Sequence, residues 1–524
     1  MLGDADNMNP IISQISSAAD IWGLLFLRLT KSSFDTASGA LTYKPSLATR
    51  WQMSPDNKSI TYTMRTDAKW SDGKPITPAD VKFSYELYGD TAIGSVRQQH
   101  LSEFVKDAKG NTDFDQAMVI TDTTITFNFD RPLSESLALF QTNLTPVPKH
   151  IWETVPRKEI RNSPYNSTPV TAGFYTLKKW TRQSEVILES NPTWNVPAPG
   201  KTPLITYRII PEYTTRLTQL KTNAIDLTES ITPADARPLE KENPNLKLRI
   251  AAGRAYDQVA WSNIDHELYN KTGKVKPHPL FGSKKVRQAL TFAIDRQSII
   301  EGFLGKYGRV AVAPISPAFK WAYNDALTPY PFDPEKAKAL LKEEGWKIGS
   351  GGILEKNGKK FSFSLVTNSG NPRRNYAATI VQQNLKNIGI ECNVELSEAV
   401  VFFGKMRKRE YDACLTGYQV GLQIDLKDAW GSDLKKSQFN SVGFQNKRID
   451  ELMAQGGAKL NAFDAAAEWK ELQAIIHEEQ PVTYLYWINP IHGFNRRITG
   501  EEVNIFGAQY NVEEWSIDQT LTEK

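Results

Sequence analysis

The chain has 524 residues, including 13 Trp, 19 Tyr and 23 Phe, and its hydrophobic fraction is 40%. This composition excludes disordered, collagen-like and coiled-coil proteins, and the length predicts roughly two to four domains' worth of core. A formal net charge of +4 is too balanced to favour nucleic acid or an anionic membrane as the main partner. The best apolar run, 21–29, contains Arg28 and is much shorter than the ~20 residues that a membrane-spanning helix needs.

Neither the cysteine content nor the amino terminus indicates the cellular compartment of the protein. Cys392 and Cys414 are too few for a disulfide framework and lack zinc-binding spacing, and whether they pair stays open. No secretion signal is visible, because Met1 is not followed by a basic and then an apolar region. We therefore expect a mature chain with an added methionine, so that localisation must follow from function.

The first 130 residues have the pattern of hairpins and short helices. Residues 60–65 alternate apolar and polar side chains, as in a half-buried strand, and 120–130 are rich in strand-forming residues. Thr77 and Pro78 supply a cap and a first residue for a helix that we expect to end near Tyr88. The proline-rich stretch that follows, from 140 to 205, is typical of a segment that joins or decorates domains.

From about residue 284 the sequence alternates helices and strands. The clearest pattern has three strands separated by two helices: strands at 361–367, 390–396 and 411–415, and helices at 374–388 and 399–409. Right-handed crossovers turn such a β-α-β-α-β block into a parallel sheet. We therefore predict an α/β protein.

Polar and aromatic side chains follow the strands of this block. In a parallel sheet, ligands bind beyond the carboxyl ends of the strands. The side chains at or just after these ends are Asn368, Arg373, Arg374, Glu398 and Tyr418. The sequence thus predicts a binding site at this edge of the sheet.

Catalytic and metal-binding motifs are missing from the sequence. The six histidines are isolated, and neither HExxH nor GxSxG occurs. Residues 349–352 are rich in glycine, but they follow a helix and precede a hairpin, which is the wrong context for a phosphate-binding loop. Cys414 lies within an apolar strand, where a thiol is expected to be inert. We therefore predict no enzyme activity, no cofactor and no metal site.

Several segments taken together resemble the extracytoplasmic solute-binding proteins of peptide, opine and nickel ABC transporters. The matching stretches are Asn9-Pro10, 45–85, 147–150, 191–194, 220–228, 286–302, 330–346 and 361–418. They follow the order of this oligopeptide/dipeptide-binding family from about residue 9 to the end. The sequence departs from the family at 171–175, which reads TAGFY in place of Gly-Thr-Gly-Pro-Tyr, and at 419–430, which is longer than usual. In relatives the second segment lines the pocket, so its length bears on ligand specificity.

The resemblance implies a two-lobe, periplasmic-binding-protein-like fold of type II, in which the lobes close about a hinge over an interlobe cleft. Lobe I would comprise 1–45, 170–254 and 489–524, and lobe II would comprise 255–488. Residues 46–169 would form an extra subdomain inserted in lobe I.

The resemblance also implies ligand contacts for charged residues. In peptide-binding relatives an aspartate after the third strand of the block holds the α-ammonium of the ligand, and Asp425 matches it by position, with Asp428 as the neighbouring choice. A dipeptide-binding relative uses an arginine after the first strand for the ligand carboxylate, which implies this role for Arg373 or Arg374. The alternatives are a solvated loop for Asp425 and a solvated helix start for the arginines.

Aromatic and backbone contacts are implied in the same way. Tyr418 replaces the usual tryptophan of the family and is expected to stack on the ligand, and Trp430 is a second candidate. Core packing is the alternative for both rings. Gln14, Ile15 and Ser16 lie where relatives offer backbone groups to a peptide.

Together, these patterns predict a monomeric binding protein that takes up short peptides and delivers them to a cognate ABC permease in the membrane. The alternative on the same fold is an oligosaccharide, opine-like or nickel-chelate ligand; thirteen tryptophans are compatible with sugar stacking. A hydrolase and a chaperone or adhesin role are the remaining hypotheses. The expected localisation is the periplasm or, through a lipid anchor, the outer face of the cytoplasmic membrane.

Overall fold

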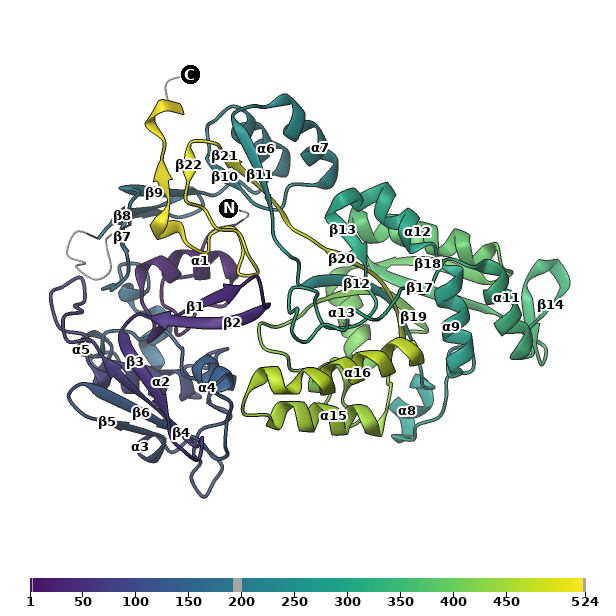
Figure 1. The fold of residues 1–524 in the computed structure, drawn as a ribbon, viewed down its shortest axis with the longest axis horizontal. Coiled ribbons are helices and arrows are strands. Elements are labelled where there is room, and N and C mark those ends of the chain that lie inside the picture. Colours follow the sequence, from purple (N-terminus) through teal and green to yellow (C-terminus); the bar gives the residue numbers. More distant parts are fainter. Residues whose placement is uncertain (2, 192–199, 522–524) are drawn as a thin grey trace.

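The computed structural model describes residues 1, 3–191 and 200–521. Two bodies lie side by side and are joined by two extended chain segments (Figure 1). We call the body with strands β1–β11 and β21–β23 lobe I, and the body with β12–β20 lobe II. The residue boundaries expected from the sequence, including the inserted subdomain at 46–169, stay a prediction.

Lobe I consists of small antiparallel sheets covered by helices. Its strands are β1 (Thr30–Asp35) with β2 (Ala40–Pro45); β3 (Ala48–Met53), β4 (Ser59–Met64), β6 (Thr124–Asn128) and β5 (Met118–Ile120); β7 (Tyr175–Thr181), β8 (Glu185–Ser190) and β9 (Leu204–Arg208); β10 (Leu227–Thr228), β21 (Ile491–Asn495) and β11 (Leu246–Ile250); and β22 (Ile498–Thr499) with β23 (Ser516–Ile517). Burial alternates residue by residue along β4, which confirms the strand predicted at 60–65.

The helices of lobe I are α1 (Ser16–Leu25), α2 (Pro78–Gly89), α3 (Phe114–Ala117), α4 (Glu135–Gln141), α5 (Lys149–Trp152), α6 (Tyr213–Lys221) and α7 (Pro233–Glu242). Helix α2 begins at Pro78, as predicted. The buried Asp80 fixes this start, because its carboxylate accepts from the Thr77 backbone N–H at 2.8 Å and from the Lys149 N–H at 2.8 Å. One side chain thus connects the first turns of two helices.

Lobe II is built on one six-stranded sheet. Its order is β13 (Gly308–Val310), β20 (Val482–Ile488), β12 (Ala255–Trp261), β19 (Ala413–Gln419), β17 (Ser362–Asn368) and β18 (Glu391–Ser397). Strand β17 is parallel to both β18 and β19, which confirms the predicted block. Strand β12 pairs antiparallel with β19 and β20, so the complete sheet is mixed.

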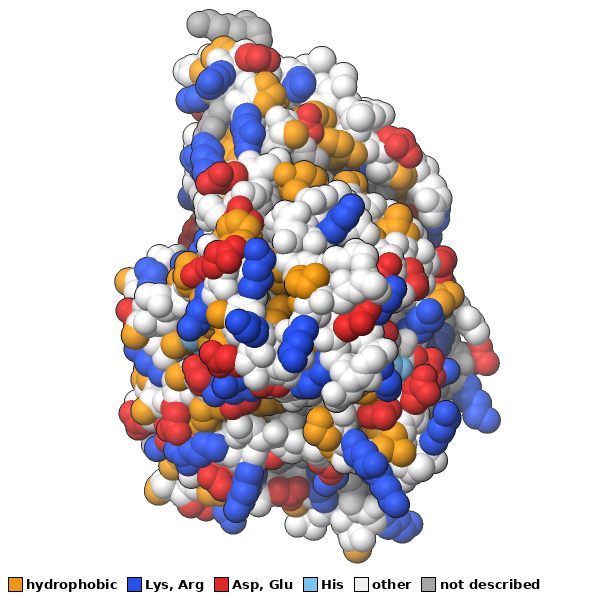
Figure 2. All heavy atoms as spheres, turned by 90° about the vertical axis from the view of Figure 1, so that its right-hand side faces the viewer, with side chains coloured by type: hydrophobic (Ala, Val, Ile, Leu, Met, Phe, Trp, Pro, Cys, Tyr) orange, Lys and Arg blue, Asp and Glu red, His pale blue; other side chains and the backbone are white. Residues whose placement is uncertain are grey.

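Helices and a small hairpin sheet surround this sheet. They are α8 (His266–Thr272), α9 (Lys284–Ala293), α10 (Arg296–Ile299), α11 (Pro334–Glu343), α12 (Pro372–Lys386), α13 (Ala399–Lys408), α14 (Lys427–Trp430), α15 (Lys447–Ala458), α16 (Ala466–Glu479), and β14 (Lys347–Ile348), β15 (Leu354–Lys356) and β16 (Lys359–Lys360). The glycines at 349–352 join β14 to β15, as a turn. On the face shown in Figure 2, basic and acidic side chains are interspersed, in keeping with the balanced net charge. No helix in the described part of the chain is long and apolar enough to span a bilayer.

The two lobes are connected by 251–254, which joins β11 to β12, and by 489–490, which joins β20 to β21. The Gly253 N–H donates to Asn489 Oδ1 at 3.0 Å, and the Gly253 carbonyl accepts from Ser316 Oγ at 2.7 Å. A Cβ atom on Gly253 would lie 1.6 Å from the Ile488 carbonyl oxygen. The crossing segments therefore approach each other so closely that position 253 requires glycine.

The lobes also touch away from the crossing segments. At the tip of the β1–β2 hairpin, the Thr36 carbonyl accepts from Lys320 Nζ at 2.7 Å and the Ser38 carbonyl accepts from the Trp321 N–H at 3.1 Å. A second contact joins Gln423 of lobe II to Ser136 of lobe I, with Nε2 3.2 Å from Oγ. The lobes are thus in contact at two places besides the crossing segments.

Cys392 lies on β18 and Cys414 on β19, on opposite sides of β17, and both thiols are free and buried. Burial raises the pKa of each thiol to about 12, so the reactive thiolate is scarcely populated at pH 8. We expect DTNB to titrate no thiol in the native protein and two after denaturation in guanidinium chloride. Rapid reaction of the native protein would contradict the buried positions.

Candidate ligand-binding cavity

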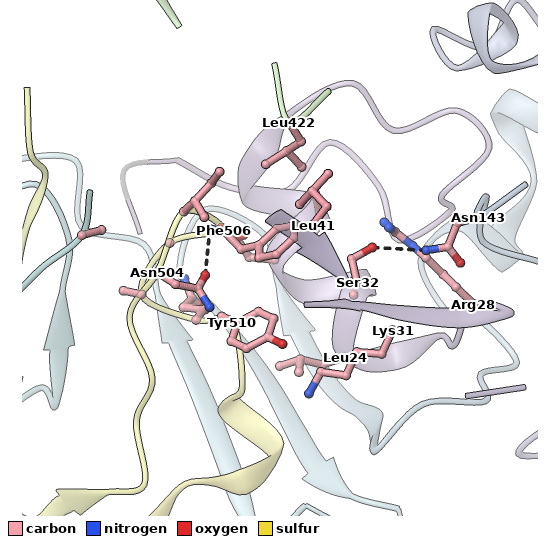
Figure 3. Close-up of a pocket in the computed structure, with 18 of the residues that line it drawn as sticks. Leu24, Arg28, Lys31, Ser32, Leu41, Asn143, Leu422, Asn504, Phe506 and Tyr510 are labelled. Atoms are coloured by element: carbon pink, nitrogen blue, oxygen red, sulfur yellow. Dashed lines mark hydrogen bonds between the residues drawn. The ribbon is translucent and has the colours of Figure 1, made fainter. Parts of the chain in front are cut away.

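A cavity of about 960 Å³ lies where the two lobes meet. Lobe I contributes α1, the β1–β2 hairpin and the loop around Asn143, and lobe II contributes Gln419 and Leu422 (Figure 3). Residues 251–255 and 488–492, in and beside the crossing segments, complete the lining. The volume falls in the upper part of the range of about 300–1,000 Å³ that small-molecule sites occupy. Any rotation of the lobes would change the shape of this cavity.

Apolar side chains from both lobes line part of the wall. Leu24, Leu41 and Phe506 of lobe I and Leu422 of lobe II line the cavity, and Leu41 lies beside Phe506 in Figure 3. Phe506 stacks on Tyr510, with ring centroids 5.4 Å apart. These surfaces can bury apolar parts of a ligand without a polar requirement.

Arg28 supplies positive charge to the cavity. Its Nε donates to Thr145 Oγ1 at 3.2 Å, and its guanidinium lies 5.7 Å from the centre of the Trp22 ring. Burial, together with the positive charge of Arg97, lowers the pKa of Arg28. Within the described residues no carboxylate pairs with Arg28, and a guanidinium stays charged at neutral pH. The cavity therefore contains an uncompensated cation that can bind an anionic ligand group.

The neighbouring cations are already engaged. Arg97 lies 5.2 Å from the same Trp22 ring, and its Nη1 donates to the Ser13 carbonyl at 2.7 Å. Lys31 forms an ion pair with Glu513. These partners distinguish the two side chains from Arg28, whose Nη groups donate no hydrogen bond to the residues that the structure describes.

His100 adds a neutral polar group. Burial, followed by the charges of Arg28 and Arg97, lowers the pKa of His100 to about 4. Its ring packs on Phe140 with centroids 4.9 Å apart, and its buried Nδ1 has no hydrogen-bond partner among the described residues. At neutral pH His100 can therefore serve as a hydrogen-bonding group that adds no charge.

The structure brings three of the predicted site residues together at the carboxyl edge of the lobe II sheet. Arg373 and Arg374 both bind Asp257, with Nε–Oδ distances of 2.8 and 3.1 Å, and Arg374 Nη1 donates to Asn368 Oδ1 at 2.7 Å. The Asp257 side chain is only 1% exposed and also accepts from the Tyr486 hydroxyl at 3.0 Å. This network compensates one charge of the arginine pair and fixes both side chains.

The other predicted residues of lobe II make contacts within that lobe. The Tyr418 hydroxyl lies 3.3 Å from the Phe439 carbonyl and 3.3 Å from Ser441 Oγ. Glu398 caps α13, because its Oε2 accepts from the Val400 N–H at 2.9 Å. Trp430 is 3% exposed and packs in the core of lobe II, which agrees with the core-packing alternative.

Asp425 lies in the lengthened segment 419–430. Its side chain is exposed, and its Oδ1 accepts from the Lys427 N–H at 3.1 Å, at the start of α14. The same segment reaches the cavity through Gln419 and Leu422. The segment thus borders the site, but the Asp425 side chain is not part of the lining.

The segment 14–16 leads into α1. Gln14 and Ile15 are exposed, the Gln14 N–H donates to Asp6 Oδ2 at 2.8 Å, and Ser16 is the first residue of the helix. Where the structure describes the chain, the cavity lining contains none of the site residues predicted from the sequence. Their contacts with a ligand stay predictions.

Sequence reasoning selected none of the lining residues. Four of the charged or polar ones that it missed are widely separated in the chain: Asp20, Arg28, Glu229 and His492. Arg28 had one visible signal, since it is the single charge within the apolar run 21–29. The other three carry no local pattern. Asp257 was missed as well, because it lies within an almost entirely buried strand and is itself buried.

Comparison with known proteins assigns the family. The family described as bacterial extracellular solute-binding proteins, family 5 middle, matches residues 42–430. The chain belongs to family 5 of the bacterial extracellular solute-binding proteins. Proteins of family 5 are extracytoplasmic and serve transport as substrate-binding proteins.

Characterised relatives support this assignment along nearly the whole chain. The oligopeptide-binding protein AppA of Bacillus subtilis (strain 168) is 29% identical over 520 residues, which cover 98% of this chain and 90% of AppA. The structure of AppA from Bacillus subtilis in complex with a nonapeptide matches with a TM-score of 0.74 at 27% identity, covering 99% of this chain and 98% of that chain.

Two more structures share the fold at 23% identity. One is NikZ from Campylobacter jejuni in complex with Ni(L-His), with a TM-score of 0.74 and coverage of 98% of this chain and 97% of NikZ. The other is the ABC transporter substrate binding protein CtaP from Listeria monocytogenes, with a TM-score of 0.81 and coverage of 99% and 98%. The two-lobe, periplasmic-binding-protein-like fold expected from the sequence is therefore confirmed.

Replacing Asp257 by Asn tests the network at the edge of lobe II. The substitution leaves Arg373 and Arg374 without their buried counter-charge, and removing one partner of a buried ion pair costs about 3–5 kcal/mol. We expect a clearly lower thermal midpoint for Asp257→Asn in a circular-dichroism melt. Asp122→Asn, at an exposed position of lobe I, is the control. Equal midpoints for the two variants would contradict a stabilising network.

Proposed function

We propose that this protein is the substrate-binding component of an ABC importer, which binds short peptides between its lobes and delivers them to a permease in the membrane. The observation that carries the proposal is the cavity at the lobe junction, with an uncompensated guanidinium and apolar walls, in a member of family 5. The solved structure of the relative AppA in complex with a nonapeptide supports the choice of peptides.

The lining suits the chemistry of a peptide. Arg28 can donate two hydrogen bonds to the α-carboxylate, and such a bidentate contact fixes the direction of the ligand. Leu41, Leu422 and Phe506 offer apolar surface to side chains, and His100 offers a hydrogen bond to the peptide backbone. Arg373, Arg374 and Asp425 remain predicted contacts for the ends of a ligand when the lobes move.

Closure about the crossing segments completes the proposed mechanism. A ligand that touches both walls binds the closed arrangement better than an open one, and this difference in affinity shifts the population toward closure. The permease would then recognise the closed pair of lobes. The protein acts as a monomer in the periplasm or, through a lipid anchor, on the outer face of the cytoplasmic membrane.

Native mass spectrometry with candidate ligands tests the proposal. Peptides of two to nine residues, nickel–histidine and oligosaccharides are each added to protein that has been stripped of ligand by denaturation and refolding. We expect peptide adducts, and we expect the same peptides to lower the radius of gyration in X-ray solution scattering. Adducts with nickel–histidine or a sugar alone would replace the peptide proposal, and identical scattering curves would argue against closure.

Replacement of Arg28 by Met tests the anion contact. Loss of the guanidinium should weaken the binding of peptides with a free α-carboxylate at least tenfold, or by about 1.4 kcal/mol. Peptides with an amidated carboxyl end should bind the wild type and Arg28→Met equally well in calorimetry. Arg50→Met, an exposed position outside the cavity, is the matched control. A loss that is the same for free and amidated peptides would show that Arg28 does not bind the carboxylate.

A further inference from the structure

Two carboxylates lie where the main cavity meets a smaller neighbouring cavity. The second cavity has a volume of about 370 Å³ and lies between α1, β9, β10 and the carboxyl-terminal segment. The linings of the two cavities share Asp20, Glu229, Ser230 and Gln509. Both carboxylate-bearing residues are exposed to solvent, so a ligand in the main cavity can reach them.

The strand register places a buried histidine next to this acidic pair. Thr228 of β10 pairs with Gly493 of β21, and the Ile231 N–H donates to the Ile491 carbonyl at 2.9 Å. Glu229 therefore lies next to His492 on the neighbouring strand, and His492 also lines the main cavity. His492 is only 4% exposed, and neither of its ring nitrogens has a hydrogen-bond partner among the described residues.

A second buried polar group near the acids also lacks a partner. The Tyr207 hydroxyl belongs to the second cavity and forms no hydrogen bond within the described residues. Burial, and then the charges of Asp20 and Glu229, raise the pKa of Tyr207. Buried polar groups normally find partners in a finished site, so unpartnered groups beside two carboxylates indicate that a polar ligand group belongs here.

The described chain places a cation near the acids, the Met1 ammonium, whose burial lowers its pKa while the charge of Glu229 partly offsets that lowering. Neither Asp20 nor Glu229 forms an ion pair there, and Glu229 accepts only a long contact, 3.4 Å, from Gln509 Nε2. The Met1 ammonium donates to the Arg208 carbonyl at 2.6 Å, and Arg249, opposite His492 on β11, is paired with Glu501. Asp20 is open to solvent on one side, but protein surrounds the rest of its carboxyl, and this desolvation, followed by the charge of Glu229, raises the pKa of Asp20 to about 7. A cation placed between the two carboxylates would relieve this repulsion.

We propose that Asp20 and Glu229 form a subsite for an ammonium group of the ligand, with His492 as a neutral hydrogen-bond acceptor beside it. The inference rests on the proposed function, because it assigns one end of a peptide in the same cavity. The ammonium comes from the amino terminus of the peptide or from a lysine side chain. The subsite is separate from Asp425, the residue that the sequence resemblance implies for an ammonium.

The experiment compares short-peptide libraries of two to nine residues in three forms: unmodified, N-acetylated without lysine, and N-acetylated with lysine. Binding is measured for the wild type and for the double variant Asp20→Asn/Glu229→Gln. Asp122→Asn/Glu159→Gln, with two exposed carboxylates outside both cavities, is the matched control. The variant Asp425→Asn is measured alongside.

The wild type and the control should bind unmodified peptides at least tenfold more tightly than acetylated, lysine-free ones, and the double variant should lose this preference. If the wild type also binds acetylated peptides with lysine more tightly than acetylated peptides without it, and the double variant loses this second preference, the lysine side chain is the source of the ammonium. The inference is overturned if the double variant keeps the wild-type preference, if the wild type has none, or if only Asp425→Asn removes it. Failure of every peptide to bind the wild type would instead refute the proposed function, and the subsite with it.

A thermal melt checks that the double variant folds. Because the two acids repel each other and form no ion pair within the described chain, their neutralisation should leave the midpoint unchanged or raise it. A lower midpoint would mean that the carboxylates stabilise the empty protein through contacts within the chain, which contradicts a subsite reserved for a ligand.

Discussion

The architecture depends on two strand pairs that continue each other across the lobe boundary. Strands β12 and β20 are neighbours in the sheet of lobe II, and the chain continues from them into β11 and β21, which are neighbours in lobe I. Between these pairs the two crossing segments are in close contact at Gly253, where the Ile488 carbonyl leaves no space for a side chain. The lobes therefore share one narrow connection, and the cavity lies directly beside it.

The charges near the connection fall into two classes. Asp257 is compensated by two arginines and a tyrosine hydroxyl, so it holds together the elements of lobe II. Arg28 and the pair of Asp20 and Glu229 have no such partners in the described chain. Uncompensated charges in a partly desolvated site are costly, and a ligand of complementary charge recovers that cost on binding. This contrast distinguishes structural charges from those available to a ligand.

Sequence reasoning succeeded where the signal is local. The β-α-β-α-β block could be predicted because its periodicity, caps and turn glycines all lie within about sixty residues, and crossover handedness then leaves one arrangement of the strands. For the same reason Asn368, Arg373 and Arg374 could be placed at one edge of the sheet, where the structure brings them together; their contacts with a ligand stay predictions. Their partner Asp257 could not be predicted, because β12 enters the sheet from more than one hundred residues earlier and carries no polar pattern of its own.

The sequence by itself determined the family, the two-lobe fold and the βαβ edge of lobe II, since these follow from motifs in a fixed order and from local periodicity. Only the tertiary structure decided which side chains line the cavity. Asp20 lies on α1, Glu229 follows β10 and His492 lies on β21, so their separation in the chain exceeds two hundred residues at each step. They meet because antiparallel pairing brings the end of the chain back between strands of lobe I, and no local pattern encodes that long-range register.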